Sequence, residues 1–365
     1  MSGLLDGFRD PEIARGLVDA IRETARTPCT LMEVCGTHTM AIAKHGLRGL
    51  MPETINLLSG PGCPVCVTAN ADIDLAIEIA RQPGVILTTF GDMMKVPGSY
   101  SSLSAEKADG RDVRVVYSPL DSLAIAEREP DKHVVFLGVG FETTAPTVAL
   151  TIAEAARRGL PNWSALSLHK TVPDALRALV NDPEVRVTGF ILPGHVSTII
   201  GLEPYRFLAE EYGVPSVITG FEPVDVLQGV WMLATQVAEG RAEVEIAYGR
   251  GVSPEGNPAA LAAIERAFEP CDSEWRGIGV IPGTGLALRP EFADFDARVR
   301  IPVTPPEPRE ITGCQCGDVL RGVVLPFECR LFGRGCTPEH PVGPCMVSSE
   351  GSCAAYYRYT DYGKE

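Results

Sequence analysis

The stretch VVFLGVGFETTAPTVALTIAEAARR (residues 134–158) places an apolar run directly before a glycine-containing loop and a helical stretch. The same order recurs in TLMEVCGTHTMAIAK (30–44) and in INLLSGPGCPVCVTANADIDLAIEIA (55–80). Strands that alternate with helices at this spacing form βαβ units, in which the sheet is mostly parallel. The sequence therefore predicts an α/β fold.

The length and the rhythm of the chain divide it into three parts. A chain of 365 residues exceeds what one small core accommodates. We expect a first α/β domain over residues 1–127, whose N-terminal helix can pack on the C-terminal domain, and a second over 128–300. The stretch IPVTPPEPRE (301–310) contains four prolines and reads as a stiff linker. It opens a cysteine-rich third part, residues 301–365.

Charge and hydropathy exclude two classes of partner. The net charge of −15 disfavours binding to a nucleic-acid backbone, which requires a basic face. The most apolar stretch, VVFLGVGF (134–141), is far too short to cross a bilayer. The N-terminus also lacks the pattern of a signal peptide. We expect a cytoplasmic protein that binds neither nucleic acid nor membrane.

Six polar loops follow apolar runs directly: CGTH, GPGCPVC, FGDMM, GFETT, PGHVS and GFEPVD. In an open parallel sheet the ligand sits beyond the carboxyl ends of the strands. We therefore expect these loops to line one cleft between the two α/β units.

The tail carries six of the eleven cysteines in its last 52 residues. Four of them follow the spacing C-x14-C-x6-C-x16-C: Cys314, Cys329, Cys336 and Cys353. Four thiolates in a segment with little apolar core suit a [4Fe–4S] cluster or a structural zinc ion. Zinc sites usually contain two tight knuckles, and the only tight pair here is Cys314 with Cys316. The pattern thus favours iron–sulfur.

Two further cysteine motifs lie near the start of the chain. Cys63 and Cys66 stand three positions apart before an amphipathic helix, where a helix start would help metal binding and disulfide exchange equally. Cys35 and His38 can face one metal, or serve as nucleophile and base. His38 can equally be a packing residue, so these motifs alone leave the roles open.

Taken together, these segments resemble the HypD family of [NiFe]-hydrogenase maturation factors over nearly the whole chain. The resemblance rests on CGTH (35–38), GPGCPVC (60–66), FGDMMKVPGS (90–99), GFETTAP (140–146), LPGHVS (192–197), GFEPVD (220–225) and the cysteine-rich tail (314–357). The tail and GPGCPVC are the most specific of these. Lys95 departs from the family pattern, in which we expect arginine at this position in many relatives.

The resemblance implies two Rossmann-like parallel-sheet α/β domains that face a cleft, plus a small domain that holds a [4Fe–4S] cluster. It implies that the cluster ligands are Cys314, Cys329, Cys336 and Cys353. Cys35 corresponds to the thiolate of the iron site, with His38 beside it. Cys63 and Cys66 correspond to a redox pair in the cleft.

The remaining tail cysteines, Cys316 and Cys345, resemble a second dithiol that relays electrons. The resemblance implies an assembly scaffold, on which iron acquires cyanide and carbon monoxide before delivery to the hydrogenase large subunit. The resemblance implies a small HypC-type chaperone that shares the iron and a HypE-type protein that supplies cyanide. The function expected is thus redox-active assembly of a metal centre.

Two rival functions use the same residues. An iron–sulfur-linked thiol–disulfide oxidoreductase would have a cluster and a reducible disulfide but no second iron. A binding protein would use a structural cluster and a docking surface only. Infrared bands of cyanide and carbon monoxide distinguish the scaffold from the oxidoreductase.

Overall fold

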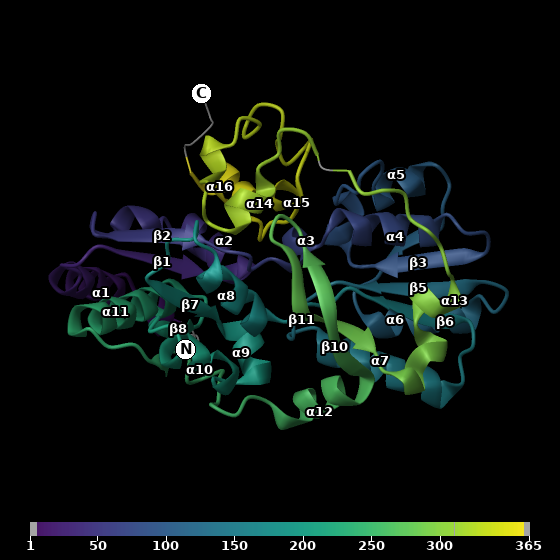
Figure 1. Cartoon of the computed structure of the whole chain (residues 1–365), viewed down its shortest axis with the longest axis horizontal. Helices are drawn as coiled ribbons and strands as arrows, with labels where there is room; N and C mark the ends of the chain where they lie inside the picture. The colour runs from purple at the N-terminus through teal and green to yellow at the C-terminus, as the bar shows by residue number, and fades with distance from the viewer. Residues whose placement is uncertain (1–5, 310, 361–365) are drawn as a thin grey trace.

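The computed structural model describes residues 6–309 and 311–360. Two parallel sheets form its centre, with helices packed around them and a cysteine-rich segment above their junction (Figure 1). The expected α/β fold is confirmed. Each sheet with its helices is called a lobe below, named by its number of strands. Within the described residues, no helix is long and apolar enough to cross a membrane.

The five-stranded lobe contains strands in the order β2-β1-β7-β8-β9, all paired in parallel. These strands are β1 (Cys29–Glu33), β2 (Ile55–Ser59), β7 (Gly189–Pro193), β8 (Ser216–Thr219) and β9 (Val244–Ile246). Its helices are η1 (Asp6–Arg9), α1 (Pro11–Thr24), α2 (Gly36–Lys44), η2 (Leu47–Leu50), α9 (Gly194–Ile200), η4 (Glu203–Tyr205), α10 (Arg206–Glu210) and α11 (Pro223–Glu239). Asp10 caps α1, which packs against α11.

The four-stranded lobe has the order β4-β3-β5-β6, again parallel throughout. Its strands are β3 (Val85–Thr89), β4 (Val113–Val115), β5 (His133–Gly138) and β6 (Trp163–Ser167). The helices around it and at the junction are α3 (Pro64–Val67), α4 (Asn70–Ala80), η3 (Gly91–Lys95), α5 (Leu103–Ala108), α6 (Pro119–Arg128), α7 (Ala145–Arg158), α8 (Val172–Asn181) and α12 (Pro258–Ala267).

The chain passes between the lobes more than once. It leaves the first sheet after β2, builds all four strands of the second, and returns with β7. After β9 it crosses again, because α12 packs against α7. The five-stranded sheet is therefore assembled from two separate parts of the chain, and the four-stranded sheet from the part between them. The domain boundary expected between residues 127 and 128 lies between β3 and β5 in the chain. Because these two strands pair with each other, this boundary would divide one sheet.

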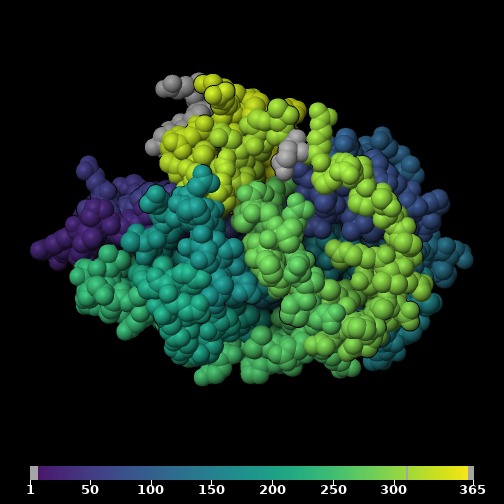
Figure 2. Space-filling model, in the orientation of Figure 1, coloured from purple at the N-terminus to yellow at the C-terminus, as the bar shows by residue number. Residues whose placement is uncertain are grey.

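An antiparallel hairpin, β10 (Phe268–Trp275) with β11 (Gly279–Leu288), reaches from the four-stranded lobe to the cysteine-rich segment (Figure 1). After η5 (Pro290–Phe295) and α13 (Ala297–Arg300), residues 301–309 form neither helix nor strand. This extended stretch runs over the surface of the four-stranded lobe (Figure 2). Its backbone is held there by Asn70 and Ser99, which hydrogen-bond to Arg309 at 3.0 and 2.7 Å.

The cysteine-rich segment contains short helices only: α14 (Cys316–Leu320), η6 (Pro326–Glu328), α15 (Pro344–Val347) and α16 (Ser352–Tyr359). Its own hydrophobic core is small and includes Phe332, Met346 and Tyr356. A segment with so little apolar core needs another source of stability, and a metal centre is one such source.

Candidate functional site

Both sheets contain a point where the direction of strand addition reverses. In the five-stranded sheet the chain leaves β1 for β2 on one side and β7 for β8 on the other. In the four-stranded sheet it leaves β3 for β4 and β5 for β6. Ligands of open α/β sheets bind at such switch points. Here the loops at the two switch points face one cavity.

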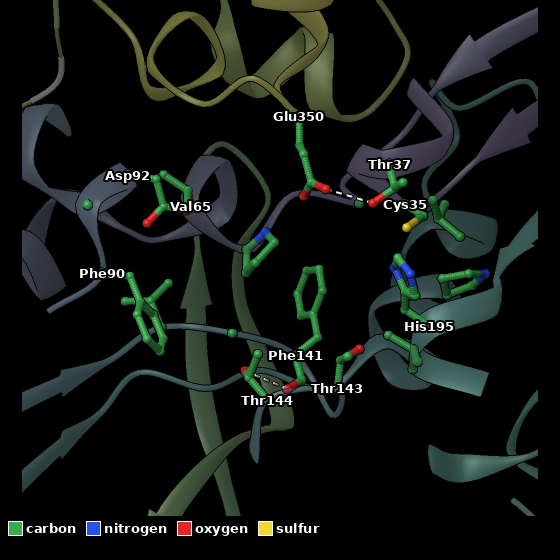
Figure 3. A pocket seen from close by; sticks show the side chains of 18 of the residues that line it. Cys35, Thr37, Val65, Phe90, Asp92, Phe141, Thr143, Thr144, His195 and Glu350 are labelled. Carbon is green, nitrogen blue, oxygen red and sulfur yellow. Dashed lines mark hydrogen bonds between the residues drawn. The ribbon is translucent and has the colours of Figure 1, made fainter. Parts of the chain in front are cut away.

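This cavity has a volume of about 440 Å³ and lies between the lobes (Figure 3). Five of the six loops that were expected to share a cleft contribute to its lining, with one representative each in Cys35, Pro64, Asp92, Thr143 and His195. The sixth loop, GFEPVD, lies behind the wall and contributes no lining residue among those described.

Cys35 caps the start of α2 and is 8% exposed. Burial raises the pKa of its thiol to about 12, and the carboxylate of Glu350 contributes to the rise. The backbone N–H groups of Thr37 and His38 act in the opposite direction. The thiol is therefore protonated at neutral pH, and a metal that binds there must displace the proton.

Glycine allows the GPGCPVC loop to pack directly on Cys35. The N–H of Gly36 donates to the carbonyl of Gly62 at 2.9 Å. A Cβ atom on Gly62 would lie 2.1 Å from the backbone nitrogen of Cys35, which no side chain could tolerate. The two cysteine motifs thus adjoin because position 62 has no side chain.

His38 lies inside α2 and does not line the cavity. Its ring is fully buried, and its Nε2 is 2.8 Å from both the carbonyl of Gly220 and the hydroxyl of Thr219. A bond to a carbonyl requires the proton on Nε2, which leaves Nδ1 unprotonated and without a hydrogen-bond partner among the described residues. Burial lowers the pKa of this imidazole to about 4. In this geometry His38 joins α2 to the loop after β8.

His195 occupies the position in the cavity that the sequence led us to expect for His38. It lines the cavity on the same side as Cys35, and its ring stacks on Phe221 with centroids 3.9 Å apart (Figure 3). Burial lowers the pKa of this ring below its usual range. The PGHVS motif was a signal for this residue, because it places a histidine just beyond the end of a strand.

Glu350 reaches the same cavity from the cysteine-rich segment (Figure 3). Its Oε1 accepts a hydrogen bond from the hydroxyl of Thr37 at 2.6 Å. Its side chain covers Gly36, where a Cβ atom would lie 2.4 Å from that of Glu350. No sequence signal pointed to this residue, since its partner is 313 positions away.

Cys63 and Cys66 lie just behind the cavity wall. Pro64 and Val65, between them, line the cavity, whereas the cysteines are 3% and 0% exposed. Cys63 caps the short α3, and the N–H of Cys66 donates to its sulfur at 3.3 Å. The sequence suggested a thiolate stabilised by a helix start. Instead, burial raises the pKa of Cys66 well above its usual range.

A line of thiols leads from this pair into the cysteine-rich segment. The N–H of Cys66 donates to the sulfur of Cys63, and its thiol lies 3.9 Å from the carbonyl of Pro344, the residue before Cys345. Cys345 in turn lies 2.7 Å from Cys316, sulfur to sulfur. Cys316 hydrogen-bonds to Cys314. The two cysteine pairs that the family resemblance implied thus lie next to each other in the structure.

All six tail cysteines line a second, small cavity of about 20 Å³: Cys314, Cys316, Cys329, Cys336, Cys345 and Cys353. Its other walls are mostly apolar and include Val319, Phe332 and Met346. Thiols that surround a dry centre suit an iron–sulfur cluster in their donor chemistry.

The six thiols stand around this cavity rather than at a single point. Within the described ranges, no three His, Cys, Asp or Glu side chains converge closely enough to hold a single ion. A zinc ion requires four ligands at one point. A four-iron cluster instead has each cysteine on a different iron, so its ligands stand around the centre.

Known proteins match this chain over nearly its full length. A model of the HypD family, described as the hydrogenase formation hypA family, matches residues 12–360. The hydrogenase maturation factor HypD of Rhodobacter capsulatus is 50% identical over 364 residues, which cover 96% of this chain and 97% of that protein. The factor of the same name from Escherichia coli K12 is 44% identical over 371 residues and 99% of both chains.

Proposed function

This chain belongs to the HypD family of hydrogenase maturation proteins, and we propose that it is a scaffold on which iron acquires cyanide and carbon monoxide for a [NiFe]-hydrogenase. The observation that most supports this is the cavity between the lobes, where loops from two switch points surround one thiol. Such convergence is typical of a binding site for a small reacting group.

Cys35 is the residue that we assign to the iron. A thiolate is a soft ligand and suits the low-spin iron that binds cyanide and carbon monoxide. A single protein thiolate leaves most coordination positions open for these ligands and for a partner's cysteine. Among the groups that face Cys35, His195 and Glu350 can orient ligands by hydrogen bonding (Figure 3).

A small HypC-type chaperone would supply that cysteine by docking at the mouth of the cavity. Tyr117 marks the mouth, because it lines the cavity and is still 94% exposed. A HypE-type protein would deliver cyanide at the same opening. The completed iron group would then pass to the hydrogenase large subunit.

Cys63 and Cys66 would provide the electrons for cyanide release. When a dithiol reduces a thiocyanate, the S–C bond breaks, the dithiol becomes a disulfide, and its two protons appear on the released thiol and on hydrogen cyanide. The dithiol of Cys316 and Cys345 would then reduce that disulfide, because the Cys66 thiol lies 3.9 Å from the carbonyl of Pro344, the residue before Cys345.

The remaining tail cysteines would hold a [4Fe–4S] cluster: Cys314, Cys329, Cys336 and Cys353. When bound, such a cluster supplies electrons one at a time. The role of this segment is to keep its thiols around a dry centre next to the second dithiol.

Two single substitutions separate the iron site from the cluster. Cys35→Ala, purified with its chaperone, should lose the infrared bands of cyanide and carbon monoxide but keep the iron and sulfide of the cluster. Cys329→Ala should lose cluster iron and sulfide. Cys271→Ala is the control, since this cysteine lines neither of the two cavities. Full infrared bands in Cys35→Ala would place the iron elsewhere.

The same spectra test the rival function. If the wild-type complex contains the cluster but shows no cyanide or carbonyl band, the oxidoreductase interpretation replaces the scaffold.

The dithiol has its own test. Cys63→Ser and Cys66→Ser should each abolish hydrogenase maturation and leave the cluster in place, because serine cannot form the disulfide. Mass spectrometry after alkylation, over a series of buffered potentials, should show both wild-type cysteines oxidised together in the metal-free protein. Cysteines that stay fully alkylatable under oxidising conditions would contradict the redox role.

A further inference from the structure

The tip of the β10–β11 hairpin lies where the two lobes and the cysteine-rich segment meet (Figure 1). Trp275 forms an isolated antiparallel bridge with Thr68, and the N–H of Arg276 donates to the carbonyl of Val67 at 2.9 Å. The hairpin tip therefore contacts the two residues that directly follow Cys66, Val67 and Thr68.

Arg276 is a buried cation at this tip. Its guanidinium is held by two backbone carbonyls, with Nε 2.8 Å from the oxygen of Thr68 and Nη2 3.3 Å from that of Pro97. Arg276 is 8% exposed. Among the described residues, the only other buried lysine or arginine is Lys170, which pairs with Asp72 at 3.7 Å.

Arg276 has no such carboxylate. In the part of the chain that the structure describes, no acidic group lies within 4.0 Å of it. Backbone carbonyls satisfy its hydrogen bonds but do not neutralise its charge. A buried charge without a counter-ion is costly, so a nearby group that becomes negatively charged would stabilise it.

The hairpin tip adjoins the helix that begins with one of the tail cysteines. Gly277, the next residue, packs against Gly317 at the start of α14, so closely that a Cβ atom on Gly277 would lie 2.0 Å from the Cα of Gly317. Cys316 begins this helix.

We propose that Arg276 is the counter-charge of the cysteine-rich centre, and that it raises the reduction potential of the cluster held there. This inference rests on the cluster assignment made above. Four thiolate ligands bring four negative charges, and reduction adds one more. A fixed cation near the ligand loop stabilises the reduced form more than the oxidised form. Arg276 is thus a positioning residue for electron supply and not a ligand.

The test is a dye-mediated potentiometric titration of the cluster-loaded protein, followed by electron paramagnetic resonance. In Arg276→Gln the ratio of reduced to oxidised cluster, at the midpoint potential of the wild type, should fall by about tenfold. Arg276→Lys keeps the charge and should stay within about twofold of the wild type. Arg289→Gln is the control, since Arg289 also binds carbonyls, of Glu265 and Phe268, at the opposite end of the hairpin.

A second pair of variants covers the case in which Arg276→Gln fails to fold. Ile278→Glu adds a carboxylate two positions from the guanidinium, and Ile278→Gln adds the same shape without charge. The glutamate should lower the reduced fraction, and the glutamine should not. The inference would be overturned if Arg276→Lys and Arg276→Gln had equal potentials, or if Ile278→Glu and Ile278→Gln did. A wild-type protein without iron and sulfide would overturn the cluster assignment and this inference together.

Discussion

Glu142 places an ionisable carboxyl group where almost no solvent reaches it. It is 4% exposed, and its Oε1 accepts the N–H of Val172 at 2.9 Å. Its Oε2 has no hydrogen-bond partner among the described residues. Burial raises the pKa of this carboxyl to about 7. The folded protein therefore retains a proton here that the unfolded chain releases near pH 4.5.

We predict that Glu142→Gln makes stability less dependent on pH. Because the folded-state pKa is raised, the favourable contribution of the protonated group is complete below about pH 4.5 and is lost as the pH rises through about 7. Between pH 5 and pH 8 the free energy of unfolding of the variant should therefore improve on that of the wild type by about 2 to 3 kcal/mol. Urea denaturation at both pH values measures this. A difference that is constant with pH would contradict the prediction.

For single residues, the sequence predicted which residue types take part in the site better than it predicted where each side chain lies. Cys35 could be found because a thiol directly after a strand end is recognisable in the chain itself. His38 was the wrong histidine for the lining of the cavity, because helix geometry turns it toward Gly220 instead. Glu350 could not be found, since its place depends on how the tail docks on α2.

The β10–β11 hairpin is the element that the sequence did not reveal. Its first strand, FEPCDSEW, contains a proline and mostly polar residues and is buried only at its ends. It therefore lacks the apolar alternation by which strands are recognised. The strand–loop–helix units were predictable, by contrast, because their apolar residues repeat regularly, as Ile73, Ile77 and Ala80 do on the buried side of α4.

Two glycines in the hairpin turn allow its contact with the tail to be tested. Gly277 and Gly279 both have positive φ, of 73° and 101°, but only Gly277 has a close neighbour. Alanine at either position costs the backbone strain of a positive φ. Gly277→Ala must also displace Gly317. Its free energy of unfolding, measured by urea denaturation, should therefore fall by about 2 kcal/mol more than that of Gly279→Ala. Equal losses in the two variants would mean that the hairpin tip does not hold the tail.

At the scale of the whole molecule, the two lobes share one chain in an interleaved order. Local periodicity shows where strands lie but not which strands pair, because pairing depends on contacts between distant segments. The division expected at residues 127 and 128 was based on the alternation of strand and helix patterns along the sequence. In the structure β1 pairs with β7, and β3 pairs with β5, across that division.

We predict that residues 1–127 do not fold alone. This fragment contains β1 to β4 but lacks β5 and β7, the inner neighbours of β3 and β1. Each sheet would be reduced to two parallel strands with an open apolar edge. Circular dichroism of the fragment should show no cooperative thermal transition, and co-expression with residues 128–365 should restore one. Cooperative unfolding of the fragment by itself would contradict the interleaved order.

The crossings between the lobes also have a mechanical consequence. A single tether would let two bodies swivel freely, whereas several connecting segments oppose sliding and leave bending as the easiest relative motion. The first of these segments runs from β2 to β3 and includes α3, with Cys63 and Cys66. These two cysteines therefore lie on one of the connections between the lobes. A disulfide between these cysteines would stiffen this connection and its reduction would loosen it, so that under the proposed function the redox state of the pair and access to the cavity would be coupled through the same few residues.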